Sequence, residues 1–255
     1  MNALVRSLIE KAACDNGWEI ATSESEKILQ LSSARHEGRI RVEQGDASDS
    51  FVVFSISADV AAELSKSFSE KVAAYDSFCL HGTFELGRIL RRAAQLYFSL
   101  PDRPAKRCAG LAAKLTAKMS ADELKTEVAR TTLQRLHQDE FRASLLNYWQ
   151  NACSVTGIDL PEILRASHIK PWKDCETDSQ RLNVYNGFLL VANLDALFDR
   201  GLITFDDTGK LICSSKLSAK QKSDLNLSED MHLRWINPSH QSFLYWHQKE
   251  VFKGR

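Results

Sequence analysis

The sequence predicts an α+β fold with three parts, and three observations support this. Strand-like segments alternate with polar turns near the N-terminus. A long stretch with helical apolar spacing follows them, and residues 153–205 then have the order strand, loop, strand, helix. We therefore expect a small N-terminal α+β domain at 1–100, a basic helical connector at 101–135 and a second domain at 136–255.

The composition is that of a globular protein and argues against several other classes. The chain has 255 residues, 44% of them hydrophobic, and its 33 Lys and Arg residues equal its 33 Asp and Glu residues, so the net charge favours no partner. Residues 1–18 carry charges where a signal peptide would be apolar, and no apolar run is long enough to span a membrane. The six cysteines include no CxxC pair, which disfavours a four-cysteine zinc site. Reduced thiols and a cytoplasmic location are the expected state.

The elements of the N-terminal domain are predicted from apolar spacing. Leu4, Leu8 and Ala12 recur one helical turn apart, which predicts an amphipathic helix over 2–14 with these side chains on its apolar face. Residues 58–74 also have helical spacing. Strands separated by polar, glycine-containing turns are expected at 27–32, 39–43 and 51–56. We expect this domain to serve in recognition or dimerisation.

The middle of the chain is predicted to be helical and basic. Apolar residues recur at helical spacing over 84–101, and further helices are expected within 121–149. Over 88–142, twelve Lys and Arg residues stand against six Asp and Glu residues. Two interpretations stay open at this point: a basic helical arm that contacts phosphates, or an ordinary solvated helix surface.

Side chains that can support chemistry gather within residues 153–205. The expected elements are a strand that ends at 166–169, a strand at 187–191 and a helix at 194–200. Asp195 and Asp199 are four residues apart, so they share one face of this helix. His168 lies at the end of the first strand. We expect it to meet both carboxylates at one point.

The remaining C-terminal elements are predicted from turn residues and apolar runs. Asp206–Gly209 is a hairpin signature, and the flanking segments 202–204 and 211–213 are expected to pair. A short strand is expected at 233–235. A helix at 241–252 closes the predicted domain.

This stretch resembles the HNH endonuclease family, whose catalytic unit is a ββα fold around one divalent metal ion. The similar segments are Ala166–Trp172, Asn186–Gly187 and Leu194–Leu202. The resemblance implies that the catalytic residues are His168, as the general base, and Asn186, whose side chain braces the loop that aims the base. It also implies that Asp195, nine residues after Asn186, is a metal ligand, and that Asp199 is a further ligand one helical turn on.

One position departs from the family pattern. Many members have Asp or His immediately before the base, where this chain has Ser167. A hydroxyl is a weaker ligand, so the resemblance implies a metal ion held by the two carboxylates, Ser167, water and the substrate phosphate. Oxygen ligands favour Mg²⁺ or Mn²⁺ over zinc. The candidates for phosphate contacts, each with an ion pair to a nearby acidic residue as its alternative, are Arg165, Lys170, Arg181 and Arg200.

The resemblance implies a metal-dependent endonuclease that hydrolyses phosphodiester bonds in double-stranded DNA, with a restriction or defence role. Cutting both strands with one site per chain implies a homodimer. Two alternatives stay open. One is a DNA-binding module with a decayed site, which Ser167 favours; the other is a structural-zinc protein, which the scattered cysteines disfavour.

Overall fold

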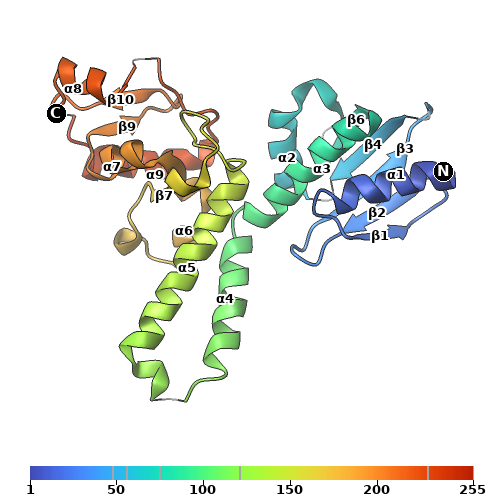
Figure 1. The fold of residues 1–255 in the computed structure, drawn as a ribbon, viewed down its shortest axis with the longest axis horizontal. Coiled ribbons are helices and arrows are strands. Elements are labelled where there is room, and N and C mark those ends of the chain that lie inside the picture. Colours follow the sequence, from blue (N-terminus) through green and yellow to red (C-terminus); the bar gives the residue numbers. More distant parts are fainter. Residues whose placement is uncertain (48, 56, 75, 121, 229, 255) are drawn as a thin grey trace. The chain divides into compact units, whose positions relative to one another are not determined.

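The structure is a computed structural model, and it describes residues 1–47, 49–55, 57–74, 76–120, 122–228 and 230–254. The protein has the predicted α+β class (Figure 1). The chain divides into two compact units, Met1–Leu100 and Pro101–Arg255, each with its own buried core. Among the described helices, none is both long enough and apolar enough to cross a membrane.

The N-terminal unit is built on a six-stranded antiparallel sheet (Figure 1). Its strands lie in the order β1-β2-β3-β4-β6-β5. In β3, Ile40 and Val42 are buried whereas Arg39 and Arg41 are exposed, so the two faces differ as expected for a sheet with one covered face. The bounds are β1 Ile20–Ser23, β2 Ile28–Ser32, β3 Arg39–Gln44, β4 Ser50–Ser55, β5 Val72–Ala74 and β6 Ser77–His81.

Three helices pack with this sheet: α1 (Ala3–Cys14), α2 (Ala58–Ser67) and α3 (Gly82–Ser99). Helix α3 contacts α1, α2 and the strands β4 and β6. The buried indole of Trp18 donates a hydrogen bond to the backbone oxygen of Leu90 at 2.8 Å. This bond ties the segment after α1 to the middle of α3.

Helix α1 forms where the sequence predicts it, but two of the three residues predicted for its apolar face are wrong. The structure buries Val5, Ile9, Ala13 and the predicted Ala12, whereas Leu4 and Leu8 are 69% and 41% exposed. Both sets of residues have the same four-residue spacing, so periodicity cannot separate them. Packing against α3 decides which stripe is buried.

The helix predicted for 58–74 is wrong in its last part. Helix α2 ends at Ser67, and residues 72–74 form β5, which pairs with β6. This pairing depends on a strand, β6, that the sequence did not predict, and β1 was not predicted either. The strand predicted at 51–56 is β4, with Ile56 lying outside the described residues.

The second unit begins with a hairpin of two helices, α4 (Arg103–Thr116) and α5 (Glu127–Tyr148) (Figure 1). Pro104 occupies the first turn of α4, where a helix needs no backbone donor. The side chain of Thr126 accepts a hydrogen bond from the Ala129 amide and so caps α5. Arg107 Nη2 and Glu140 Oε2, 3.0 Å apart, join the two helices.

A strand–loop–strand–helix motif follows α5, as predicted. Strands β7 (Leu164–His168) and β8 (Gly187–Val191) are antiparallel, with His168 opposite Gly187. Helix α7 (Ala192–Asp199) begins directly after β8 and packs on both strands, which α5 also contacts. All five residues of β8 are buried, as expected for a strand covered on both faces.

The C-terminal segment packs beside this motif. Strands β9 (Ile203–Phe205) and β10 (Leu211–Cys213) form the predicted hairpin, and α8 (Ala219–Asp224) and α9 (Gln241–Glu250) follow. The strand predicted at 233–235 is wrong. There the Leu233 amide bonds to Gly209 and the Arg234 amide to Ser154, so these residues join loops instead of forming a ladder.

Candidate active site

His168 ends β7, and its imidazole is held by two aromatic side chains. The ring of Phe141, from α5, stacks on it with centroids 3.7 Å apart and planes 11° apart. The ring of Trp172 meets it edge-on at 5.9 Å. Burial lowers the pKa of His168 to about 4. The imidazole is therefore neutral, and able to accept a proton, across the physiological pH range.

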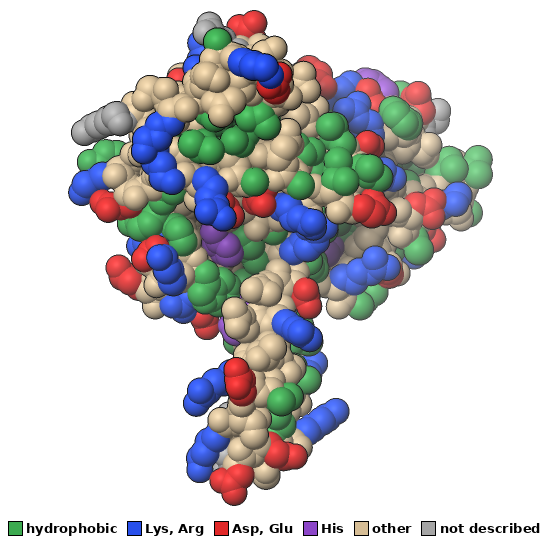
Figure 2. Space-filling view, turned by 60° about the vertical axis from the view of Figure 1, so that its left-hand side comes forward, with side chains coloured by type: hydrophobic (Ala, Val, Ile, Leu, Met, Phe, Trp, Pro, Cys, Tyr) green, Lys and Arg blue, Asp and Glu red, His purple; other side chains and the backbone are tan. Residues whose placement is uncertain are grey.

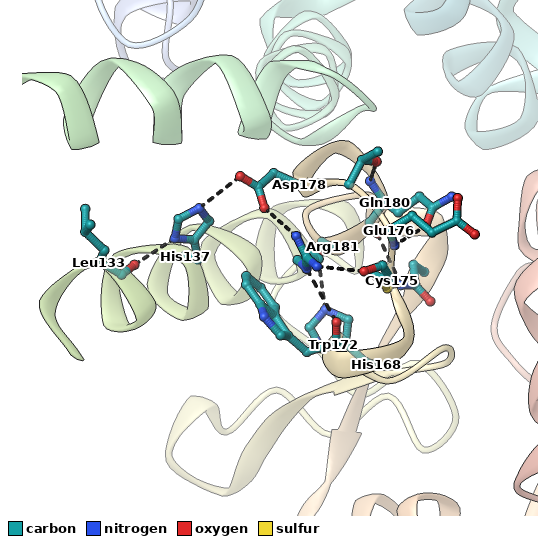
Figure 3. Close-up of polar contacts among 11 residues, drawn as sticks. Leu133, His137, His168, Trp172, Cys175, Glu176, Asp178, Gln180 and Arg181 are labelled. Atoms are coloured by element: carbon teal, nitrogen blue, oxygen red, sulfur yellow. Dashed lines mark hydrogen bonds and ion pairs between the residues drawn. The ribbon is translucent and has the colours of Figure 1, made fainter. Parts of the chain in front are cut away.

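A backbone hydrogen bond determines which nitrogen of His168 can act as the acceptor. Nε2 lies 2.8 Å from the backbone oxygen of Arg181 (Figure 3). A carbonyl oxygen only accepts, so Nε2 carries the proton and Nδ1 keeps its lone pair. Within the described part of the chain, no hydrogen bond reaches Nδ1. This tautomer leaves Nδ1 as a general base.

Gly187 makes room for the ring that stacks on His168. A Cβ atom at Gly187 would lie 2.5 Å from Cζ of Phe141 and 2.9 Å from Cδ1 of Leu145. The φ angle of Gly187 is −160°, which any residue adopts. Space, and not backbone conformation, therefore requires glycine here.

The fully buried side chain of Asn186 holds the loop between the two strands. Its Oδ1 accepts from the Lys170 amide at 2.8 Å. Its Nδ2 lies 3.2 Å from the backbone oxygens of Lys170 and Gln180 and 3.3 Å from Sγ of Cys175. Asn186 thus ties the start of the loop to its far end.

Arg181 lies at the end of the short helix α6 (Asp178–Arg181), and its guanidinium is used within the chain (Figure 3). Nη2 donates to the Cys175 backbone oxygen at 2.7 Å, Nη1 pairs with Asp178 Oδ1 at 2.9 Å, and Nε donates to the Trp172 backbone oxygen at 3.4 Å. Of the two interpretations of Arg181, the structure shows the ion pair with an acidic neighbour. These bonds use three of the five N–H donors of the guanidinium and hold it against the loop.

His137, on α5, extends this network to the helical hairpin (Figure 3). Its Nδ1 donates to the Leu133 backbone oxygen at 2.7 Å, and its Nε2 lies 3.6 Å from Oδ2 of Asp178. The ring also meets Trp172 edge-on at 5.5 Å. Helix α5 therefore contacts this part of the site through two side chains, Phe141 on His168 and His137 on Trp172 and Asp178.

The two carboxylates of α7 face Ser167 on the other side of β7. Oγ of Ser167 donates to Oδ1 of Asp199 at 3.3 Å and also hydrogen-bonds Asp195. Partial burial raises the pKa of both carboxyls, and the charge of Asp195 raises that of Asp199 further. Negative charge is thus held at a cost here, which a bound cation would offset.

His168 and Ser167, the strand residue that contacts the carboxylates, point to different faces of β7, so the expected convergence of His168 with the carboxylates stays a prediction. Successive residues of a strand point to opposite faces, so Ser167 faces α7 and His168 faces α5. Among the described residues, no hydrogen bond or ion pair joins His168 to Asp195 or Asp199. The two halves of the site are adjacent through the backbone of β7.

The oxygen donors fit a hard divalent cation better than zinc. In the described ranges, no group of three or more His, Cys, Asp and Glu side chains could hold a metal ion. The chain thus offers Asp195, Asp199 and the hydroxyl of Ser167. Mg²⁺ binds through one or two carboxylates and keeps several waters, whereas zinc takes Cys, His and a fuller set of protein ligands.

Three of the four basic candidates have unpaired side chains. Arg165 and Arg200 are exposed and Lys170 is half-buried. Over the residues that the structure describes, none of these side chains forms an ion pair or hydrogen bond. Arg165 lowers the pKa of Asp195 and Arg200 lowers that of Asp199, so both charges act on the carboxylate side.

Comparison with protein-family models matches residues 153–206 to the family described as HNH endonuclease. The C-terminal unit contains an HNH endonuclease domain. The matched residues include β7, β8 and α7, with His168 and Asn186. This assignment supports a nuclease-type function that acts on DNA. A search of curated proteins finds no match to the chain.

Sequence reasoning missed two features of this HNH domain. One is Phe141, which stacks on His168 from outside the matched residues. Its spacing to Leu145 indicates a helix face, but not which side chain lies on the imidazole. The other is the loop network of Arg181 and Cys175, for which the sequence has no periodic signal.

Proposed function

We propose that this protein is a divalent-metal-dependent endonuclease that hydrolyses phosphodiester bonds in double-stranded DNA. The observation that carries the proposal is the state of His168 in an HNH domain: a neutral imidazole with Nε2 bonded to the Arg181 carbonyl and with Nδ1 as its acceptor. Hydrolysis of a phosphodiester needs a group that takes a proton from the attacking water. Nδ1 of His168 has the tautomer for that role.

The loop residues position this base. Asn186 and Arg181 hold the loop from Lys170 to Arg181 through backbone oxygens and amides, so the Arg181 carbonyl stays in place. Phe141 and Trp172 fix the ring plane and keep water from one face of the imidazole. These residues hold the proton on Nε2, which keeps Nδ1 unprotonated.

Asp195, Asp199 and Ser167 are the residues that would hold the metal ion. A bound Mg²⁺ or Mn²⁺ supplies a positive charge that stabilises the developing negative charge of the phosphate and the leaving oxygen. The carboxylates are suited to this because burial raises the pKa of both, and the charge of Asp195 raises the pKa of Asp199 further. Ser167 orients them by its hydrogen bonds.

The proposed phosphate contacts are Arg165, Lys170 and Arg200, whose side chains have no partner within the described residues. Arginine matches a phosphate with two parallel hydrogen bonds. Arg181 is assigned instead to holding the loop, because its guanidinium bonds to Trp172, Cys175 and Asp178.

The role of the whole protein is also part of the proposal. The separate N-terminal unit, Met1–Leu100, is suited to recognition or dimerisation, because the nuclease residues all lie in the second unit. A homodimer with one site per chain would cut both strands. A restriction or defence role follows from the resemblance of the HNH domain, and protection of cells against foreign DNA would test it.

A decayed nuclease that only binds DNA is the second candidate. Ser167, where many family members have a charged ligand, favours it, because the protein then supplies only two negative ligands. Nicking of supercoiled plasmid separates the two candidates. An active nuclease nicks with Mg²⁺ or Mn²⁺ and stops with excess EDTA; a decayed module binds the plasmid and never nicks it.

Metal binding itself has a readout that does not depend on cleavage. Mg²⁺ should raise the melting temperature of the wild-type protein, because a cation offsets the repulsion between the two carboxylates. The double variant Asp195→Asn/Asp199→Asn should melt at the same temperature with and without Mg²⁺. An equal Mg²⁺ effect on both proteins would contradict these ligands.

A further inference from the structure

We propose that helix α4 carries a second DNA-contact surface, outside the HNH domain, which binds the backbone of the duplex beside the cut site. The surface consists of Lys106, Lys114 and Lys118. This inference rests on the DNA substrate proposed above, and it adds the position of the bound duplex along α4. Of the two interpretations of the basic middle segment, it selects the phosphate-binding arm.

The charge of α4 is of one sign. Residues 103–121 contain five Lys and Arg residues and no Asp or Glu, although the whole chain has equal numbers of both. Helical residues advance about 100° each, so Arg103, Lys106, Arg107 and Lys114 fall within an arc of about 100°. Lys118 lies in the turn that directly follows the last helical residue, Thr116. A solvated helix surface would be expected to alternate charges, and this stripe does not.

The lysines of the stripe are available to a ligand. Lys106, Lys114 and Lys118 are exposed, and within the described part of the chain their side chains form no ion pair or hydrogen bond. Arg107 is different, because it pairs with Glu140 and holds α4 to α5. Ala109, Gly110, Ala113 and Ala117 are exposed between the lysines, so little bulk separates the helix backbone from a bound surface.

The hairpin holds this stripe away from the rest of the nuclease unit. In Figure 1, α4 and α5 extend beyond the ββα motif, and Figure 2 shows Lys and Arg side chains projecting along the hairpin. From Lys106 to Lys118 the stripe is about 18 Å long. That length corresponds to about five base pairs at 3.4 Å per base pair.

The stripe has a defined position relative to the base. At the start of α4, Oδ1 of Asp102 accepts a hydrogen bond from Ser179 Oγ at 2.9 Å. Ser179 lies on α6, which ends at Arg181, the residue whose backbone oxygen binds His168. A duplex lying along α4 is therefore held at a defined place relative to His168. Its regular phosphates complement a row of lysines, whereas the recognition of bases is not required.

DNA binding in EDTA tests this surface without any cleavage. The full-length protein and its triple variant Lys106→Gln/Lys114→Gln/Lys118→Gln are titrated against a fluorescein-labelled 30-base-pair duplex at 50 to 300 mM salt. Each lost phosphate contact reduces the slope of log K against log salt by about 0.9, so the slope should fall by about 2 to 3. Kd at 100 mM salt should rise about tenfold or more.

A matched control removes the same charge elsewhere in the unit. Lys210, Lys216 and Lys253 are also exposed, form no ion pair within the described residues and lie outside the hairpin, and their triple change to Gln should leave Kd within about twofold. At saturating protein with Mg²⁺, the α4 variant should cleave at the wild-type single-turnover rate. Both variants should melt within a few degrees of the wild type, because all six positions are solvent-exposed.

Three results would overturn the surface: a wild-type Kd for the α4 variant, equal weakening by both triple variants, or tighter binding of single-stranded DNA or duplex RNA of the same length. The outcome is separable from the nuclease proposal. If the α4 variant loses binding and no protein cuts plasmid, the surface stands and the nuclease fails. If the α4 variant binds and cuts like the wild type, the surface fails and the nuclease stands.

Discussion

Arg181 and Arg200 are both arginines near the proposed site, but the structure uses them differently. The guanidinium of Arg181 donates hydrogen bonds to Trp172, Cys175 and Asp178. Arg200 is exposed and unpaired among the described residues. One holds the loop whose carbonyl fixes the tautomer of His168. The other is open to a phosphate. Residue type and sequence position do not distinguish these roles; only the contacts do.

This difference predicts opposite kinetic effects. Arg181→Gln should lower kcat by up to about 10²-fold, because small misplacements of a base are costly, and should leave the Kd for DNA unchanged. Arg200→Gln should raise Kd and reduce its salt dependence, with little change in kcat. Single-turnover rates and anisotropy titrations measure both. A weaker Kd with unchanged kcat for Arg181→Gln would return that residue to the phosphate contacts.

At the scale of elements, the ββα motif could be predicted from the sequence nearly to the residue. Strand β8 is a continuous apolar run, and α7 has helical spacing that begins at its end, so each boundary has a local cause. The face of α1, the strand β5 and the missed strands β1 and β6 have no such cause. Each of these features depends on contact with a segment that is not adjacent to it along the chain. The buried face of α1, which includes Val5, depends on packing with α3, and β5 depends on pairing with β6.

The packing of α5 on the motif gives a prediction at this scale. Gly187→Ala should destabilise the protein by about 1–3 kcal/mol, because the added Cβ overlaps Phe141. Phe141→Leu shortens the overlapping side chain, so the double variant should be more stable than the sum of the two single effects predicts. Urea unfolding of the four proteins measures this coupling. Strict additivity would show that Gly187 and Phe141 do not compete for space.

At the scale of the whole molecule, buried neutral histidines should make the protein sensitive to acid. Burial lowers the pKa of His247 to about 4, and its ring stacks on Phe198 with centroids 3.9 Å apart. In the unfolded chain the pKa is about 6.5, so between these values the unfolded state binds more protons than the folded state. Stability therefore falls as the pH drops from about 6.5 to about 4. His168 acts in the same direction, and the raised pKa values of Asp195 and Asp199 act in the opposite one.

The variant His247→Gln isolates one of these groups. His247 should contribute up to about 3 kcal/mol to the loss of stability between pH 7 and pH 4. The Gln variant should be less stable than the wild type at pH 7, because the stacked ring is lost, and should lose less stability on acidification. Urea unfolding of both proteins at pH 7 and pH 4 in EDTA measures this loss of stability. An equal acid effect in both proteins would show that His247 is not held neutral.

Three parts were expected from the sequence, with boundaries at residues 100 and 135. The structure has two compact units that divide at Leu100, and residue 135 lies within α5. The role of each unit was not predictable, because charge and residue spacing indicate which surfaces are exposed and do not identify what binds to them. A candidate site made of His168, Asn186, Asp195 and Asp199 was predictable from the resemblance, and its chemistry stays a prediction. The placement of Ser167 and His168 on two faces of β7 was not predictable, because the sequence does not show that α5 and α7 pack on strands β7 and β8.

The proposed hydrolysis depends on Nδ1 of His168 as the general base, so removal of this imidazole is the sharpest test. His168→Ala, with His168→Gln as a variant that keeps more of the side-chain volume under Phe141, is assayed for nicking of supercoiled plasmid with Mg²⁺, and its DNA affinity is measured in EDTA. We expect both variants to bind DNA within about twofold of the wild type and to cleave about 10² to 10⁴ times more slowly. Cleavage within threefold of the wild-type rate at equal affinity would show that His168 is not the general base.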